Sequence, residues 1–147
     1  MAKTAADLVA QAKQRVENLS VAQVAQEVER GDAVLVDLRE PEERVQHGVI
    51  PGAVLAPRGM LEFWADPASS YHRPEFDPHR RVILHCAAGG RSALAAVTLE
   101  RLGYANVAHL DGGFTAWKDA GQPVAAESGG PDDPPPPQAP AGVSFTG

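Results

Sequence analysis

The chain contains a single cysteine, Cys86, and the residues around it could make it a nucleophile. One cysteine rules out an internal disulfide and a multi-cysteine metal site within the monomer, which leaves a buried inert thiol or a reactive thiolate. Gly89 and Gly90 would let the backbone N–H groups of the loop curl inward as an anion-binding nest. A helix after the loop would add its positive dipole end. Because these groups favour the anion, we expect a lowered pKa for Cys86.

The loop that follows Cys86 could also bind an anionic substrate. We expect its substrate-binding residues to be Ala87, Ala88, Gly89, Gly90, Arg91 and Ser92. The place of Arg91 in the loop favours substrate contact over pairing with a carboxylate at the helix start. Ser92 is equally suited to cap the helix and to contact substrate. Ala87 and Ala88 carry no charge, so the loop does not encode selectivity for a highly charged substrate.

Short apolar strands alternate with helical segments along the chain. Strands are predicted at residues 33–37, 52–56, 81–86 and 107–110. Helices are predicted at residues 5–17, between Ser20 and Gly31, and at 41–47, 60–65, 91–102 and 114–120. We therefore predict an α/β fold, a single domain with a mostly parallel central sheet and helices on both faces. Ligands bind at the carboxyl ends of such strands, and Cys86 lies at one of these ends.

Four segments resemble the motifs of the rhodanese family and occur in the family's order. The segment CAAGGRS (86–92) resembles its active-site loop, and DLREPEE (37–43) resembles its first-strand motif. GVIPGA (48–53) resembles its second motif, although histidine is usual where Val49 stands. DGGFTAW (111–117) resembles its C-terminal signature. Together the four motifs identify a single rhodanese-like domain.

The resemblance implies a sulfurtransferase that works through a cysteine persulfide. Cys86 would attack the outer sulfur of a small anionic donor such as thiosulfate, release sulfite and keep the sulfur. An acceptor, cyanide or a thiol, would then remove it. No metal and no organic cofactor are implied. A sulfur-acceptor protein is a further partner compatible with this chemistry.

Other residues near the loop are expected to be structural. The resemblance implies that Asp37 and Arg39 brace the fold, with Arg39 paired to Glu43. His85 precedes Cys86 on a strand, so its side chain should point to the opposite face and take no part in proton transfer.

Two other functions remain open from the sequence. His85-Cys86 and Arg91 superficially match the loops of cysteine phosphatases and arsenate reductases, which place one more residue between cysteine and arginine. Four residues separate Cys86 from Arg91 here. The smaller space inside this shorter loop suits a persulfide sulfur better than a phosphate. A thiol reductase would need a second cysteine. The other alternative is a rhodanese-like docking or regulatory module, but such modules often lose the cysteine that this chain keeps.

Composition limits the partners and the location. The net charge of −6 argues against a nucleic-acid partner, because phosphate binding needs a basic face. No apolar run approaches the length of about 18 residues that crosses a bilayer, and the N-terminus lacks the apolar core of a signal peptide. We therefore expect no membrane partner and a cytoplasmic protein.

The chain divides into three parts. We expect an N-terminal helical extension (1–17), the rhodanese-like domain (18–126) and a Pro/Gly-rich tail (127–147). Ten of the last 20 residues are proline or glycine, which predicts a disordered or polyproline tail.

Residues 58–78 form a longer connection than a crossover needs, and they include Trp64. One interpretation is a surface excursion that packs its own aromatic side chains. The other is a flap beside Cys86 that shapes the approach of the acceptor. The flap hypothesis predicts that Trp64→Ala changes acceptor preference more than stability.

Overall fold

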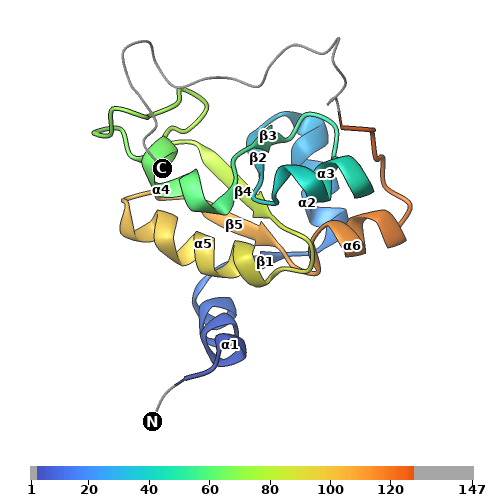
Figure 1. The fold of residues 1–147 in the computed structure, drawn as a ribbon, viewed down its shortest axis with the longest axis horizontal. Coiled ribbons are helices and arrows are strands. Elements are labelled where there is room, and N and C mark those ends of the chain that lie inside the picture. The colour runs from blue at the N-terminus through green and yellow to red at the C-terminus, as the bar shows by residue number, and fades with distance from the viewer. Residues whose placement is uncertain (1–2, 128–147) are drawn as a thin grey trace.

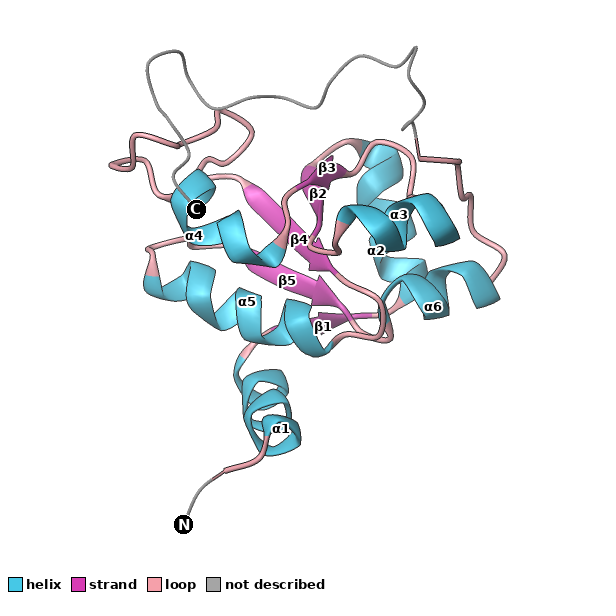
Figure 2. Ribbon diagram, in the orientation of Figure 1, coloured by secondary structure: helices cyan, strands magenta, loops and turns pink. Residues whose placement is uncertain are grey.

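A computed structural model describes residues 3–127, and its centre is a twisted parallel sheet (Figures 1 and 2). The strands are β1 (Glu17–Leu19), β2 (Ala33–Asp37), β3 (Val54–Leu55), β4 (Arg81–His85) and β5 (Val107–Leu110). Their order is β1-β5-β4-β2-β3, and each pair of neighbours is parallel. The predicted α/β fold with a parallel central sheet is confirmed.

Helices cover both faces of this sheet (Figure 1). They are α1 (Ala5–Arg15), α2 (Val21–Arg30), α3 (Pro41–His47), α4 (Leu61–Ala65, after the 3₁₀ turn Arg58–Met60), α5 (Gly90–Arg101) and α6 (Gly113–Asp119). Leu61 of α4 and Leu99 of α5 belong to one buried cluster with Leu84 of β4. Val24 of α2 belongs to a second cluster with Ile83. Neighbouring side chains of β4 therefore enter opposite core layers, as the pleat of a strand requires.

Local sequence signals set the limits of several helices. Ser20 and Gln23 form the expected capping box at the start of α2, and Gly31 ends that helix with a φ of 74°. The first helix is shorter than expected, because Val16 is extended and residues 17–19 pair with β5 as an edge strand. The polar tripeptide Glu-Asn-Leu gives no strand signal, so β1 was not predicted.

The connection between residues 58 and 78 packs Leu61, Ala65 and Phe76 into the buried cluster that also contains Cys86. In Figure 1, α4 and the loop after it lie at the left, whereas β4 points to the right. Tyr104, which precedes β5, donates its hydroxyl proton to the carbonyl of Ala65 at 2.7 Å. Trp64 packs against the core, and the guanidinium carbon of Arg73 lies 3.7 Å from the Trp64 ring centroid. These contacts favour a surface excursion with its own aromatic packing, and an influence of the segment on the approach of the acceptor stays a prediction.

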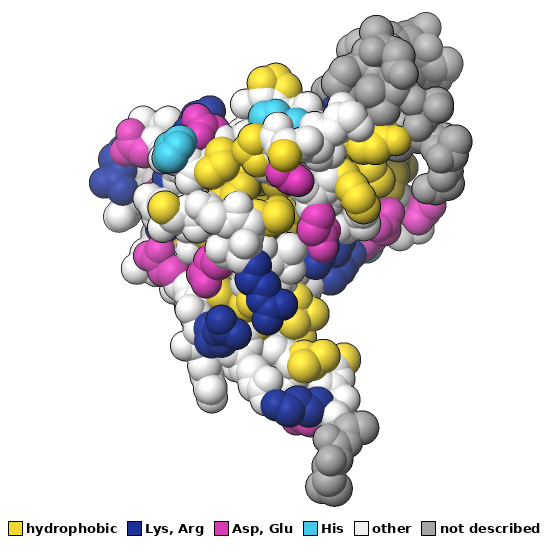
Figure 3. Space-filling view, turned by 90° about the vertical axis from the view of Figure 1, so that its left-hand side faces the viewer, with side chains coloured by type: hydrophobic (Ala, Val, Ile, Leu, Met, Phe, Trp, Pro, Cys, Tyr) yellow, Lys and Arg dark blue, Asp and Glu magenta, His cyan; other side chains and the backbone are white. Residues whose placement is uncertain are grey.

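The surface over this excursion is mixed in character. Figure 3 shows apolar side chains lying between charged ones on this side of the molecule. None of the helices within residues 3–127 is long and apolar enough to cross a membrane.

The ends of the described chain are attached to the rest of the molecule. Helix α1 packs against α5. Near the other end, Arg44 Nε donates to a carboxylate oxygen of Glu127 at 2.7 Å. The remainder of the expected Pro/Gly-rich tail, residues 128–147, lies outside the described residues, and the proposed division into three parts stays a prediction.

Candidate active site

Cys86 directly follows β4, at the edge of the sheet where the parallel strands end. Its side chain is buried, with 1% of its surface exposed. The backbone N–H of Gly89 donates a hydrogen bond to Sγ at 3.2 Å. Gly89 has a φ of 108°, which favours glycine, and it immediately precedes α5. The loop therefore curls back onto the sulfur that precedes it.

Burial and hydrogen bonding act in opposite directions on the pKa of Cys86. Burial is the largest single effect and raises the pKa. Hydrogen bonds from the Ser92 side chain and from the backbone N–H groups of Ser92, Gly89 and Ala88 lower it. The hydrogen bonds together prevail, so the pKa of Cys86 lies below its ordinary value. The loop stabilises the thiolate.

The start of α6 holds the loop from the other side. The backbone N–H of Phe114 donates to the carbonyl of Cys86 at 2.8 Å, and that of Thr115 donates to Ala87 at 3.0 Å. Gly113 has a φ of 61°, and a Cβ there would lie 2.6 Å from the carbonyl oxygens of Cys86 and Ala87. The glycine therefore allows the close approach that the two hydrogen bonds need.

Arg91 lies at the rim of the loop and binds a carboxylate of α3. Its two terminal nitrogens donate to the two carboxylate oxygens of Glu43 at 2.7 and 2.9 Å. The hydrogen bond from Arg91 is the largest cause that lowers the pKa of Glu43 to about 2. The same pair, with a smaller contribution from Cys86, raises the pKa of Arg91. Two expectations are thus corrected: Arg91 pairs with a carboxylate, and Glu43 pairs with Arg91 instead of Arg39.

Asp37 and Arg39 form a buried ion pair at the end of β2. Arg39 donates from Nη2 and Nε to the two carboxylate oxygens of Asp37 at 2.8 and 3.0 Å. Arg39 also donates to the carbonyl of Gly48 at 2.8 Å, and its guanidinium carbon lies 4.1 Å from the Phe114 ring centroid. Burial raises the pKa of Asp37, but the bonds from Arg39 prevail and hold it below its ordinary value. These contacts brace β2 against α6, the structural role expected from the resemblance.

His85 points into the core layer opposite Cys86, as strand alternation predicted. Its ring stacks with that of Phe114 at a centroid distance of 6.5 Å, and its Nε2 lies 3.8 Å from Asp37 Oδ2. Burial is the largest influence and lowers the pKa of His85, so the ring is neutral at pH 7.

Ser92 contacts the sulfur from behind the loop. Its Oγ lies 3.6 Å from Cys86 Sγ, 3.3 Å from the Gly89 carbonyl oxygen and 2.9 Å from His109 Nδ1. The hydroxyl therefore does not cap α5. Sequence reasoning did not identify His109, although a lone histidine inside the apolar strand β5 was a visible signal.

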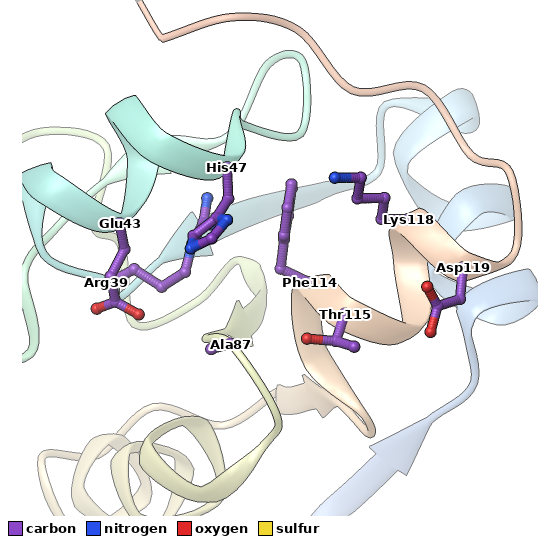
Figure 4. A pocket seen from close by; sticks show the side chains of 8 residues that line it. All are labelled: Arg39, Glu43, His47, Ala87, Phe114, Thr115, Lys118 and Asp119. Atoms are coloured by element: carbon purple, nitrogen blue, oxygen red, sulfur yellow. The ribbon is translucent and has the colours of Figure 1, made fainter.

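A cavity of about 340 Å³ lies beside the loop, bounded by the eight side chains labelled in Figure 4. Ala87 of the loop and Phe114 of α6 line it together with Glu43 and His47 of α3. Cys86 is not among the lining residues, because its sulfur lies deeper. Lys118 of α6 points its ammonium group toward Phe114 (Figure 4), and it has no ion-pair partner within residues 3–127. The cavity thus adjoins the cysteine loop at Ala87.

Comparison with known proteins gives a consistent result. Residues 20–120 match the rhodanese-like domain family. A sulfurtransferase from Allochromatium vinosum is 35% identical over 98 residues, which cover 67% of this chain and 83% of the relative. A thiosulfate sulfurtransferase from Pseudoalteromonas translucida is 34% identical over 104 residues, covering 70% of this chain and 90% of the relative.

A solved structure gives the same fold. It is a protein of unknown function from Rhodopseudomonas palustris, described as a possible tyrosine phosphatase. It is 41% identical to this chain with a TM-score of 0.80, and the match covers 84% of this chain and 96% of that protein. The family match, the named relatives and the cysteine loop at the strand ends lead to one conclusion: the chain belongs to the rhodanese-like sulfurtransferase family.

Proposed function

We propose that this chain transfers sulfane sulfur from a small anionic donor such as thiosulfate to cyanide or a thiol, with Cys86 as the carrier. The Cys86 thiolate attacks the outer sulfur of thiosulfate, and sulfite leaves with the electron pair of the broken S–S bond. An acceptor nucleophile then attacks the outer sulfur of the persulfide and releases the Cys86 thiolate. Sulfur arrives and leaves in separate steps, so ping-pong kinetics are expected.

The geometry around Sγ carries this proposal. The N–H of Gly89 at 3.2 Å and the lowered pKa of Cys86 favour a nucleophilic thiolate. Inward-facing N–H groups would also stabilise the terminal sulfur of a persulfide and the oxygens of the donor. We propose as substrate-binding residues Ala87, Ala88, Gly89, Gly90, Arg91 and Ser92. Arg91 would contribute its backbone N–H, because its guanidinium is bound to Glu43.

The cavity beside the loop is the proposed approach for both substrates. Its volume admits a small anion or a thiol, and Lys118 offers a cation at its edge. A thiol carried by a partner protein could reach the same opening, so a sulfur-acceptor protein is compatible with this site.

A phosphatase is the alternative raised by the likeness to the Rhodopseudomonas palustris structure. Two observations favour sulfur transfer over phosphate chemistry. Four residues separate Cys86 from Arg91, so the loop is shorter than that of a cysteine phosphatase and encloses less space. Both terminal nitrogens of Arg91 are bound to Glu43, so they are not directed at a phosphate in the loop.

One pair of assays separates these functions. The purified protein and its Cys86→Ser variant are incubated with thiosulfate and cyanide, and thiocyanate is measured; p-nitrophenyl phosphate hydrolysis is followed in parallel. We expect thiocyanate from the wild-type protein alone. Phosphate ester turnover without thiocyanate would assign a phosphatase, and the absence of both reactions would assign a docking module.

A further inference from the structure

A series of hydrogen-bonded side chains runs from the sulfur through two buried residues to Asn18, which is exposed on the edge strand β1. Ser92 Oγ lies 3.6 Å from Cys86 Sγ, and His109 Nδ1 lies 2.9 Å from the same hydroxyl. On the far side of the ring, His109 Nε2 lies 2.7 Å from Asn18 Oδ1. Asn18 and His109 are register partners on the neighbouring strands β1 and β5. Ser92 and His109 are fully buried.

Asn18 fixes which nitrogen of His109 carries a proton. The Asn18 amide nitrogen donates to the carbonyls of Lys13 at 2.8 Å and Val16 at 3.0 Å. Its oxygen must therefore be the atom that faces His109, and this oxygen can only accept. His109 Nε2 is consequently the donor of the 2.7 Å hydrogen bond. In the neutral ring, Nδ1 is then the unprotonated nitrogen.

This tautomer determines which hydrogen bonds the Ser92 hydroxyl can donate and accept. Burial is the largest influence and lowers the pKa of His109, so the ring is neutral when no anion lies nearby. The unprotonated Nδ1 accepts the hydroxyl proton of Ser92, at a shorter distance (2.9 Å) than the Gly89 carbonyl (3.3 Å). A hydroxyl group has one proton, so Ser92 cannot donate to His109 and to a Cys86 thiolate together. While His109 is neutral, Ser92 can therefore only accept from the Cys86 thiol. The hydrogen bond from Ser92 that lowers the pKa of Cys86 is available only when His109 Nδ1 carries a proton.

We propose that His109 receives the proton of Cys86 through Ser92 when the thiolate forms. The S–H bond of Cys86 breaks and its proton bonds to Ser92 Oγ, while the hydroxyl proton of Ser92 moves to His109 Nδ1. The products are a thiolate and an imidazolium, and the net charge is unchanged. Ser92 then donates to the thiolate and accepts from His109, and Asn18 still accepts from Nε2. His109 acts through Ser92, so it is a positioning residue for the nucleophile.

The other charged groups around His109 come from α1 and from the residues after β5. Lys13 of α1 lowers the pKa of His109, and Asp111 raises it. The two groups also pair with each other at 3.2 Å, so their effects on the ring oppose one another. Within residues 3–127, the hydrogen bonds of the ring to α5 and β1 involve the uncharged groups of Ser92 and Asn18. The thiolate is therefore the charge that changes at this ring during the reaction.

The inference rests on the proposed role of Cys86 as nucleophile, but its test needs no sulfur donor. The rate of alkylation by iodoacetamide reports the thiolate directly, because Cys86 is the only cysteine. We expect the alkylation rate of the wild type to rise twice as pH increases. In the first rise the thiolate forms beside a protonated His109. In the second rise the remaining proton is lost, and the thiolate lies beside a neutral His109. His109→Asn keeps a polar contact with Ser92 but cannot hold the proton. It should show a single rise at higher pH, with a rate at pH 7 reduced by about tenfold or more.

Two further variants give the sign of the effect. Asn18→Asp places a carboxylate against Nε2, favours the imidazolium, and should move the first rise to lower pH. Ser92→Ala removes the hydroxyl that passes the proton to His109, so its rate profile should resemble that of His109→Asn. The matched control is His72→Asn, because the His72 ring bonds to the Phe76 carbonyl at 2.8 Å, away from the cysteine loop, and its removal should leave the profile unchanged.

A direct measurement on the wild-type protein decides the question if a variant fails to fold. Nitrogen NMR of the His109 ring is recorded over the range between the two rises, before and after Cys86 is alkylated. The proposal predicts an Nδ1 proton before alkylation and its loss afterwards. A ring that stays neutral in both states, or superimposable profiles for the wild type and His109→Asn, would overturn it. Persulfide formation would then still stand, since that reaction is measured separately.

Discussion

The ionisation of Cys86 links the chemistry of one residue to the stability of the fold. The pKa of Cys86 is lower in the folded protein than its ordinary value of 9.0. The thiolate therefore contributes stability that is fully present above this unfolded value and is lost as pH falls through the folded one. We expect the free energy of unfolding of the wild type, relative to Cys86→Ser, to increase as pH rises toward 9.0. Urea denaturation at several pH values measures this difference, and a difference independent of pH would contradict the lowered pKa.

Glu43 restrains the charge of Arg91 at the rim of the loop. In Glu43→Gln the amide cannot neutralise the guanidinium, so more positive charge faces the cavity and the sulfur. We expect the KM for thiosulfate to fall by about threefold, an effect that salt weakens. Glu42→Gln, an exposed neighbour on α3, is the matched control and should leave KM unchanged. Equal changes in both variants would show that only the overall charge matters.

The residues that sequence reasoning missed have partners far away along the chain. The loop itself was predictable, because cysteine, glycines and arginine lie within a few positions of one another. Glu43 and Arg91 are 48 positions apart, and Asn18 and His109 are 91 apart. No local pattern joins such residues. Only the order of strands in the sheet brings them together.

At the scale of elements, the contact between α6 and the cysteine loop depends on Gly113. Gly113→Ala adds a Cβ at 2.6 Å from two carbonyl oxygens, so the loop or the helix must move. Gly121→Ala is a matched control, since its φ of 77° is also positive but no atom lies within 4 Å of the added Cβ. We expect both variants to lose about 1 to 2 kcal/mol of stability from the backbone conformation. Sulfur transfer should fall only in Gly113→Ala, and equal activities would contradict this role for the contact.

The excursion between β3 and β4 is expected to contribute stability and not specificity. Trp64 is partly buried against the core and packs under Arg73. We expect Trp64→Ala to lower the free energy of unfolding by about 2 to 3 kcal/mol, because a large side chain leaves a cavity. Ratios of kcat/KM among cyanide and thiol acceptors should stay constant. A changed ratio in a fully folded variant would support the hypothesis that this segment acts as a flap.

Elements with strong local signals were predictable, and the others depended on the rest of the fold. Helices α2 and α3 carry their own start signals, Ser20 with Gln23 and Pro41 at the first position. Strand β1 has three residues and only Leu19 is buried, so its pairing with β5 alone identifies it. Because β1 was missed, Asn18 could not be placed beside His109.

For the whole molecule, the distribution of charge matters more than its sum. The net charge of −6 repels an anionic donor, yet Lys118 lies beside the cysteine loop, and Arg91 begins the helix that follows β4 and the loop. The parallel sheet gathers the carboxyl ends of β2, β4 and β5 at one side. This arrangement brings together the buried Asp37–Arg39 pair, the cysteine loop and His109. The fold thus places the N–H groups around Sγ and the Lys118 ammonium group at this end of the sheet, although Glu43 and Asp119 line the same cavity.

The central claim is that Cys86 carries sulfur as a persulfide, and the mass of the intact protein tests it most directly. The protein is incubated with thiosulfate, freed of excess reagent and weighed before and after addition of cyanide. We predict a gain of one sulfur atom that disappears with cyanide and never forms in Cys86→Ser. An unchanged mass in the wild type, or the same gain in Cys86→Ser, would contradict the account.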